Sequence, residues 1–217
     1  MPALHPPRIE GPLTSAAIEL DHDADLDELD VAELATTGSP LHDVRLQRSR
    51  LRQVSIAGLR LTGFELRDAV FEAVDGAGAH LGGAQWTRVE CHDCRLVGFD
   101  LSESVLRHVS FRSCRLDDAN FRLADLERVA FDDCTLRNAD FAGARLHSIT
   151  FAGSHLDDVD FSNARVDQLD FRGARLGRLL GIGGLRGSII GVDQVLPLVP
   201  ALFAELGITI AEEPELD

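Results

Sequence analysis

The sequence contains no lysine. All 21 of its basic residues are arginines, set against 36 aspartates and glutamates, for a formal net charge of −15. Binding to nucleic acid through phosphates needs a basic surface, so this acidic excess argues against a nucleic-acid ligand. It argues equally against an anionic membrane surface as a partner. Long apolar runs are also missing, so neither a signal peptide nor a membrane-spanning segment is predicted.

Cysteine is scarce as well. Four cysteines in 217 residues are too few for the dense pattern of a disulfide-stabilised secreted domain. The sequence therefore predicts a reduced, cytoplasmic protein. An apolar content of 45% excludes disorder over the whole chain, and the length allows a sizeable core.

A repeat of five residues dominates the sequence. From Leu41 to Leu176 every fifth residue is large and apolar, with Gly76 and Cys91 as the exceptions. A second series, mostly small or branched, lies two positions earlier, as in the unit Ala119-Asn-Phe-Arg-Leu123. A period of five fits neither a helix nor a long strand, but two apolar residues spaced two apart fit one face of a very short strand. Each unit is therefore predicted to form one side of a coil, and the coils must stack to bury these side chains.

The repeat runs without a break over residues 39–178 and resembles that of the pentapeptide-repeat family, whose consensus is roughly Ala-(Asp/Asn)-Leu-x-x. The resemblance implies an all-β fold, a right-handed quadrilateral parallel β-helix with four units per coil. At four units per coil, the 28 units counted from Leu41 to Leu176 would make about seven coils.

Residues one coil apart also match in kind, which supports the four-sided coil independently, because a period of five does not require it. The matching columns are Phe111, Phe131, Phe151 and Phe171; Phe121, Phe141 and Phe161; Leu96, Leu116, Leu136, Leu156 and Leu176; and Ala124, Ala144 and Ala164.

The segments outside the repeat are assigned by composition and register. Residues 1–12 are predicted to be mobile, and residues 13–38 to form an acidic cap or a partial first coil, because Ala24 and Leu29 begin units in the same register. Residues 39–178 are the β-helix, and residues 179–217 are a C-terminal helix and cap.

The C-terminal helix is predicted to begin with Asp193 as its N-cap and to end before Gly207, with Pro200 kinking or restarting it. Its apolar residues face two sides, and both sides need cover. The open end of the solenoid supplies one cover, since its strand edges need blocking. The other cover is either the same chain or a second copy in a homodimer. The candidate residues for this cap or dimer surface are Val195, Leu198, Val199, Leu202, Phe203 and Leu206.

Cys91 and Cys94 have the spacing of half a zinc site. The register offers another interpretation, because Cys91 is a central position and Cys94 begins a column with Cys114 and Cys134. Small sulfur side chains suit a tight interior. Core packing is the favoured interpretation, and no metal or cofactor is predicted.

Trp86 stands where most units have leucine or phenylalanine, and the undersized Gly76 and Cys91 lie nearby. Because interiors tolerate volume-conserving exchanges best, Trp86 is predicted to be buried and to compensate for their lost volume. A local bulge is expected over residues 74–79. The alternative is that Trp86 serves as a binding platform.

Most of the acidic excess lies outside the repeat, with −8 in residues 1–38 and −5 in residues 179–217 against −2 in the repeat itself. Sorting the units by side makes two sides acidic. The candidate partner-binding residues are Asp100, Glu103, Asp140 and Asp160 on one side and Glu90, Asp93, Asp132 and Asp133 on the other.

Catalysis is not expected, because the repeat shows no Ser/His/Asp or Cys/His arrangement and no phosphate-binding glycine motif. The favoured function is a non-enzymatic scaffold that binds an unidentified protein partner. Some pentapeptide-repeat proteins are DNA mimics that bind DNA gyrase, a type II topoisomerase, and protect it from quinolones or peptide poisons. The resemblance therefore implies a second possibility, in which the acidic side chains imitate phosphates. In the simplest alternative, mixed charges only solubilise the rod. An enzyme or small-ligand binder is the remaining, least favoured class.

Overall fold

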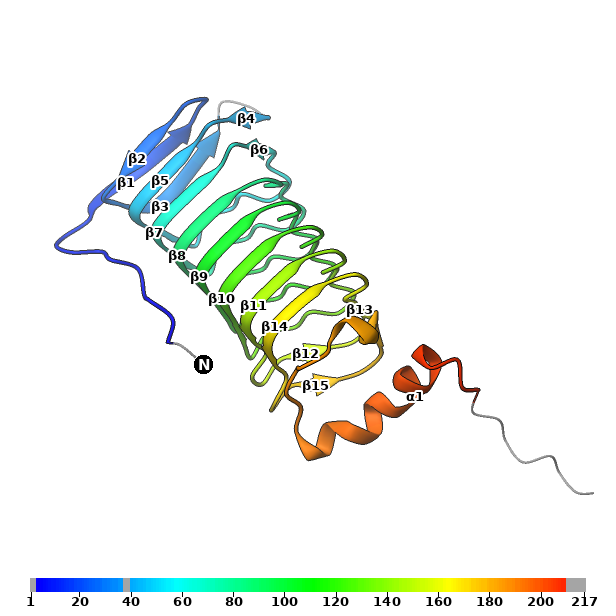
Figure 1. Cartoon of the computed structure of the whole chain (residues 1–217). Helices are drawn as coiled ribbons and strands as arrows, with labels where there is room; N and C mark the ends of the chain where they lie inside the picture. Colours follow the sequence, from blue (N-terminus) through cyan, green and yellow to red (C-terminus); the bar gives the residue numbers. More distant parts are fainter. Residues whose placement is uncertain (1–2, 37–39, 210–217) are drawn as a thin grey trace, which may run out of the picture.

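The computed structural model describes residues 3–36 and 40–209, which form a parallel β-solenoid of about 8 turns followed by a short helix (Figure 1). The right-handed quadrilateral β-helix that the family resemblance implies is confirmed, with about 8 turns in place of the expected seven coils. Each five-residue unit supplies one side of a coil, and its two apolar residues point inward.

The long strands stack in the order β1-β3-β5-β7-β8-β9-β10-β11-β14, and β2 also pairs with β5. The strands are β1 (Thr14–Leu20), β2 (Asp25–Asp27), β3 (Leu29–Thr36), β4 (Leu41–His42), β5 (Arg45–Arg52), β6 (Leu61–Thr62), β7 (Glu65–Glu72), β8 (Gln85–His92), β9 (Val105–Arg112), β10 (Asp125–Asp132), β11 (Arg145–Thr150), β12 (His155–Leu156), β13 (Val159–Asp160), β14 (Arg165–Asp170), β15 (Arg175–Leu176) and β16 (Leu179–Leu180). From β5 onward each residue pairs with the residue one coil later, as Phe111 does with Phe131.

The four sides are named here in chain order by their central residues. Face 1 contains Leu61, Leu101, Phe121 and Phe141; face 2 contains Leu46, Trp86 and Leu126; face 3 contains Phe71, Cys91 and Phe131; and face 4 contains Leu96, Leu116 and Leu136. Because the chain visits the faces in this order, faces 1 and 3 lie on opposite sides of the rod, and so do faces 2 and 4.

Each corner of the coil requires a residue in the left-handed conformation. Every fifth residue from Asp43 to Gly173 has a positive φ. At many corners the turn is closed by a backbone hydrogen bond, such as the one that Leu59 N–H donates to the Ile56 carbonyl at 3.1 Å. A turn with positive φ at its third residue favours glycine or asparagine there, which explains the residue types at Gly58 and Asn138.

The core consists of stacked columns of identical side chains. Phe111, Phe131 and Phe151 lie with successive ring centroids 5.2 and 5.1 Å apart and their planes nearly parallel. Phe121 and Phe141 stack in the same way at 4.8 Å. These are the contacts that the matching residue types predicted. Burial of each ring contributes roughly 1.5–3 kcal/mol.

The volume at the undersized Gly76 is filled differently from the prediction. Trp86 is fully buried, with Phe71, Phe99 and Phe111 around it. A Cβ on Gly76, however, would lie 2.9 Å from both Phe99 and Leu96, so these two side chains occupy this space. The bulge expected at residues 74–79 is absent from this described segment, since Asp75 bridges to residues one coil away on both sides as its neighbours do.

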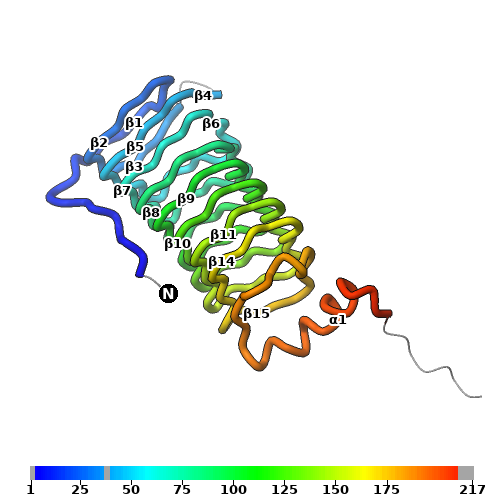
Figure 2. Tube along the Cα trace, in the orientation of Figure 1, coloured from blue at the N-terminus to red at the C-terminus, as the bar shows by residue number. Residues whose placement is uncertain are grey.

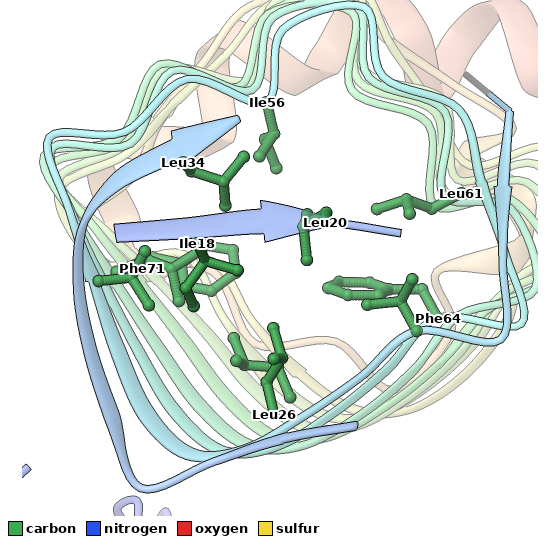
Figure 3. Close-up of a pocket in the computed structure, with 12 residues that line it drawn as sticks. Ile18, Leu20, Leu26, Leu34, Ile56, Leu61, Phe64 and Phe71 are labelled. Atoms are coloured by element: carbon green, nitrogen blue, oxygen red, sulfur yellow. The ribbon is translucent and has the colours of Figure 1, made fainter. Parts of the chain in front are cut away.

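The first coil and a crossing strand close the N-terminal end. Leu26 of β2 and Val31 of β3 stack on Leu46 and Leu51 of β5. Strand β1 pairs with β3, but its paired residues are fewer positions apart in the sequence than one full coil. It lies across the open end, where Ile18 and Leu20 point inward (Figure 3). A wholly apolar void of about 20 Å³ remains beneath it. This strand shields the edge that a bare solenoid would expose.

The C-terminal end is closed by the segment after Arg178. Strand β16 adds one more side by pairing with β13, and the chain then forms the 3₁₀ helices η1 (Ile182–Gly184) and η2 (Val192–Gln194) and the helix α1 (Val195–Glu205). The helix ends before Gly207, as predicted, at φ +70°. It does not begin on Asp193, which is exposed in η2 without a capping hydrogen bond, and Pro200 lies inside an unbroken helix.

Gln194, next to Asp193, makes the contacts that close this end. Its Nε2 donates hydrogen bonds of 2.6 Å to the carbonyls of both Phe171 and Ala174 on the last coil. Its Oε1 accepts a hydrogen bond from the Gly191 N–H at 2.7 Å. A buried glutamine thus supplies donors that a further coil would otherwise provide.

Candidate interaction surfaces

Face 1 carries a column of acidic and amide side chains at the position before each central residue. Asp100, Asn120, Asp140 and Asp160 follow one another along the rod, one coil apart. Asn120 Nδ2 donates a hydrogen bond of 2.9 Å to Asp100 Oδ1. The structure therefore places three of the four candidate residues of this side in one line.

Each member of this column also stabilises its own turn. Oδ1 of Asp100, Asp140 and Asp160 accepts a hydrogen bond from the backbone N–H two residues later, at 3.0, 2.8 and 2.7 Å respectively. Such bonds are typical of Asx turns, in which the side chain substitutes for a backbone acceptor. One carboxylate oxygen is thereby used by the fold, while the Oδ2 of Asp100 faces His80 at 3.6 Å and that of Asp140 faces Arg122 at 3.0 Å. Sequence reasoning missed this double role.

Few basic groups balance the column. Between Asp100 and Asn163, face 1 has four carboxylates and one arginine, Arg122, whose Nη1 lies 3.0 Å from Asp140 Oδ2. The fourth candidate residue, Glu103, is exposed at the corner of the same face and has no ion pair within the described residues. Between Asp100 and Asn163, face 1 is therefore an acidic surface interrupted at the coil of Asn120 and Arg122, and His80 of the preceding coil lies 3.6 Å from Asp100.

The second candidate group lies on face 3, on the opposite side of the rod. Glu90 contacts His92 at 3.0 Å, and Asp132 lies 3.9 Å from Arg112. Asp93 and Asp133 are exposed at corner positions. The eight candidate residues thus form two separate surfaces, and no single partner surface of ordinary size can meet both.

The acidic charge of face 3 is weaker than its composition suggests. Burial raises the pKa of Asp132 above its ordinary value, Arg112 opposes this shift and Asp133 adds to it. Arg172 lies 2.6 Å from Asp170 on the same face, and its hydrogen bonds lower the pKa of Asp170 despite partial burial. Arg50, Arg112 and Arg172 all lie against carboxylates of face 3, so arginine pairing balances more carboxylates here than Arg122 does on face 1 between Asp100 and Asn163.

Face 2 is the basic side, and the chain's own N-terminal segment lies against it (Figure 2). The Arg8 N–H donates to Asp68 Oδ1 at 2.9 Å. Further along the rod, the His5 N–H donates to His108 Nδ1 at 3.2 Å, and the two imidazole rings stack at 4.2 Å. Residues 3–12, expected to be mobile, therefore have defined contacts that the repeat could not reveal.

A paired carboxylate anchors this segment. Both oxygens of Asp68 accept hydrogen bonds from Arg88, at 2.5 and 2.6 Å, and both side chains are largely buried. Burial alone would raise the pKa of Asp68, but the hydrogen bonds from Arg88 and from the Arg8 N–H, with the charge of Arg88, hold that pKa below its ordinary value. Asp68 thus stays ionised at neutral pH and fixes the segment to face 2.

The C-terminal helix leaves much of its apolar surface uncovered. Leu198 is buried against the solenoid, and Val199 is partly buried. Val195, Leu202, Phe203 and Leu206 remain exposed, Leu206 to 70%. A groove of about 580 Å³ separates the helix from the last coil, with Leu180, Ile182 and Pro200 among its lining residues. Of the six residues predicted for this surface, four are accessible to a partner and Leu198 is used within the chain.

The pentapeptide-repeat pattern in the sequence, the corner geometry and the stacked core columns agree with a family model described as pentapeptide repeat region, which matches residues 90–141 and 124–179. Residues 90–179 therefore form a pentapeptide-repeat region.

Solved structures of similar architecture include other pentapeptide-repeat proteins. A trypsin-treated form of QnrB1, a plasmid-mediated fluoroquinolone resistance protein, is 16% identical, with 91% of this chain and 99% of that chain covered and a TM-score of 0.46. HetL, involved in heterocyst differentiation regulation in the cyanobacterium Nostoc sp. strain PCC 7120, is 20% identical, with 82% and 91% covered and a TM-score of 0.36. A comparison with curated protein sequences found no match.

The four cysteines, all within the pentapeptide-repeat region, are free and buried. The Cys94, Cys114 and Cys134 thiols each lie near backbone carbonyls of the preceding coil, as Cys114 Sγ does at 3.4 Å from the Cys91 oxygen. Burial raises the pKa of the Cys91 thiol well above its usual range, so it is not a ready thiolate. These contacts are those of core residues.

Residues 3–36 and 40–209 hold no group of three or more histidine, cysteine, aspartate or glutamate side chains placed to bind a metal ion. None of the helices in this part of the chain has the length and apolar character that crossing a bilayer requires.

Proposed function

We propose that this protein is a non-enzymatic interaction scaffold that binds a protein partner through face 1. The observation that carries the proposal is the row of Asp100, Asp140 and Asp160 with Glu103 beside it, accompanied by the single arginine Arg122. Face 2 is partly covered by the chain itself, and the acids of face 3 have more ion-pair partners. Face 1 is the acidic surface left for a partner, which we expect to be basic.

The test removes charge without disturbing the turns. Asn120 occupies the same column and its Oδ1 accepts the same backbone hydrogen bond, so the combined variant Asp100→Asn, Asp140→Asn, Asp160→Asn keeps the fold. We expect a partner retained from cell extract by the immobilised wild-type protein to be lost by this variant. The matched control, Asp93→Asn, Asp132→Asn, Asp133→Asn on face 3, should retain it. Equal retention by both variants would exclude face 1.

A second candidate is a DNA mimic that binds DNA gyrase, a type II topoisomerase, and protects it from quinolone-type or peptide poisons. The carboxylates of face 1, which lie in one column along a rod with Asn120 between Asp100 and Asp140, support it. The purified protein should then alter gyrase supercoiling, with and without a quinolone, and the face 1 variant should be weaker. No effect at micromolar protein would remove this candidate.

We also propose that two copies associate through the C-terminal surface made by Val195, Leu202, Phe203 and Leu206. Leu198 is buried within the chain and takes no part in this contact. Exposed apolar side chains concentrated at the end of the rod favour a self-complementary, two-fold contact. The measured mass in solution should be that of a dimer, and Phe203→Glu should reduce it to a monomer.

Four free thiols are consistent with action in the cytoplasm, as proposed from the sequence.

A further inference from the structure

Leu123 is out of place on face 1. Its side chain is 60% exposed, and it is the one large apolar side chain exposed within residues 40–178. It stands at a corner position with φ +59°, and no other large apolar residue in the described part of the chain has a positive φ.

The fold has no use for leucine at this corner. The equivalent corners of face 1 are held by Gly83, Glu103, Gly143 and Asn163. In the left-handed conformation the Cβ of an L-residue crowds the backbone, a cost that glycine avoids and asparagine reduces. Exposure of the side chain gains nothing from burial either. Leu123 therefore carries a conformational cost that stability does not explain.

The side chain is nevertheless held in a defined position. The Leu123 N–H donates to the Ala142 carbonyl of the next coil at 3.0 Å. Its Cδ2 lies 2.7 Å from the point that a Cβ on Gly143 would occupy, so the missing side chain of Gly143 makes room for it. Leu123 lies across the next coil and presents its methyl groups on a rigid surface, which limits the entropy lost on binding.

Carboxylates surround this apolar group. Glu103 occupies the same corner one coil earlier, and Asp140 is the second residue of the unit one coil later, paired with Arg122. An apolar centre within a charged border is the arrangement found at the energetically important positions of protein interfaces.

We propose that Leu123 is the apolar anchor of face 1, entering a pocket on a protein partner whose border carries arginine or lysine side chains. The proposal rests on the proposed use of face 1 and adds the residue that supplies affinity there. The proposed occupant of this surface is a protein. Carboxylates that only imitate the spacing of phosphates would not account for an exposed leucine among them.

The test combines stability with binding in the variant Leu123→Gly. Because glycine relieves the left-handed strain, its Tm should equal the wild-type value or exceed it by up to about 3 °C. With purified DNA gyrase as the probe, the protein concentration needed for half of the effect on supercoiling should rise about 10- to 30-fold. Leu123→Asn, which keeps a corner-tolerant residue, should behave in the same way. The matched control is Ser113→Gly at an exposed corner of face 3, φ +54°, which relieves the same kind of strain and should leave the half-effect concentration unchanged.

Each outcome of this test either supports or overturns the proposal about Leu123. A Tm clearly below wild type for both Leu123 variants would make the leucine structural and overturn the proposal. An unchanged half-effect concentration, with wild-type protein active, would overturn it while leaving the use of face 1 intact. If wild-type protein leaves gyrase unaffected, the topoisomerase candidate fails. The temperature scans alone then decide on Leu123, with a Tm at or above wild type in support.

Discussion

Gly76 and Phe99 exchange volume between two columns of the core. Gly76 leaves a central position of face 4 empty, and Phe99 fills it from a position that holds alanine one coil earlier and one coil later. Close packing requires the sum of the two volumes to be kept rather than either residue. The sequence shows the small residue plainly, but only coordinates show which neighbour reaches into the space.

We expect Gly76→Leu, the consensus residue at its position, to destabilise the protein by about 1–3 kcal/mol, because the new side chain collides with Phe99 and Leu96. Phe99→Ala alone should cost about 3–5 kcal/mol through the cavity it leaves. The double variant should be clearly more stable than the sum of these losses, as measured by urea unfolding. Simple additivity would show that the two sites do not share this space.

His108 gives the N-terminal segment a dependence on pH. Burial lowers the pKa of His108 from 6.5, the charges of His5, Arg128 and Arg88 lower it further, and Glu127 opposes them. A docked segment therefore disfavours the protonated ring, whose Nδ1 could no longer accept the His5 N–H. Docking is at full strength above pH 6.5 and weakens as the pH falls through the lowered pKa.

Hydrogen exchange at the Arg8 amide, which donates to Asp68, measures this docking. Its protection factor, corrected for the intrinsic rate, should be higher at about pH 7.5 than at about pH 5.5. His108→Gln lacks the titrating ring and should show no such difference. Equal protection of wild type at both pH values would contradict the role given to His108.

Among the secondary-structure elements, the contacts that recur in every coil could be predicted from the sequence, and the contacts that occur only once could not. The stacking of Phe111 on Phe131 follows from the repeat because each position recurs on every coil. The assignment of Asp100 and Asp132 to different sides follows for the same reason. Gln194 and His5 each make contacts that occur once, between residues far apart in the chain, and no periodic signal marks them. The hydrogen bonds that engage one oxygen of each face 1 aspartate in its own turn could not be predicted from the sequence either.

The C-terminal cap depends on Gln194. We expect Gln194→Ala to leave the Phe171 and Ala174 carbonyls without their donors, at a cost of about 1–3 kcal/mol confined to the end of the rod. Because each coil contacts only its neighbours, amide exchange should accelerate in residues 171–175 and stay unchanged around Phe121. Gln168→Ala on the same coil is the control. Faster exchange along the whole rod would show that the cap governs global stability instead.

For the complete rod, one whole coil can be removed without changing how the remaining coils stack, but the five-residue register cannot be shifted. Removing residues 125–144, one whole coil, joins Ala124 to Arg145, whose backbone already stacks on that of Asp125. We expect this variant to fold with the same circular-dichroism spectrum and a modest loss of stability. Removing residues 125–127 alone points the following apolar residues outward and should prevent folding. A smaller deletion that did less harm than the larger one would refute the coil as the structural unit.

The N-terminal segment returns along face 2, where His5 reaches His108, so this segment lies beside the flank of the rod and not at its tip (Figure 1). An affinity tag or fluorescent protein fused there would project from the flank of the rod at its middle coils. A fusion after α1 would instead extend beyond the rod, beside the exposed apolar residues of that helix. The choice of terminus thus decides which surface a fusion obstructs, and immobilisation by the N-terminus would turn face 4, opposite face 2, toward the solution.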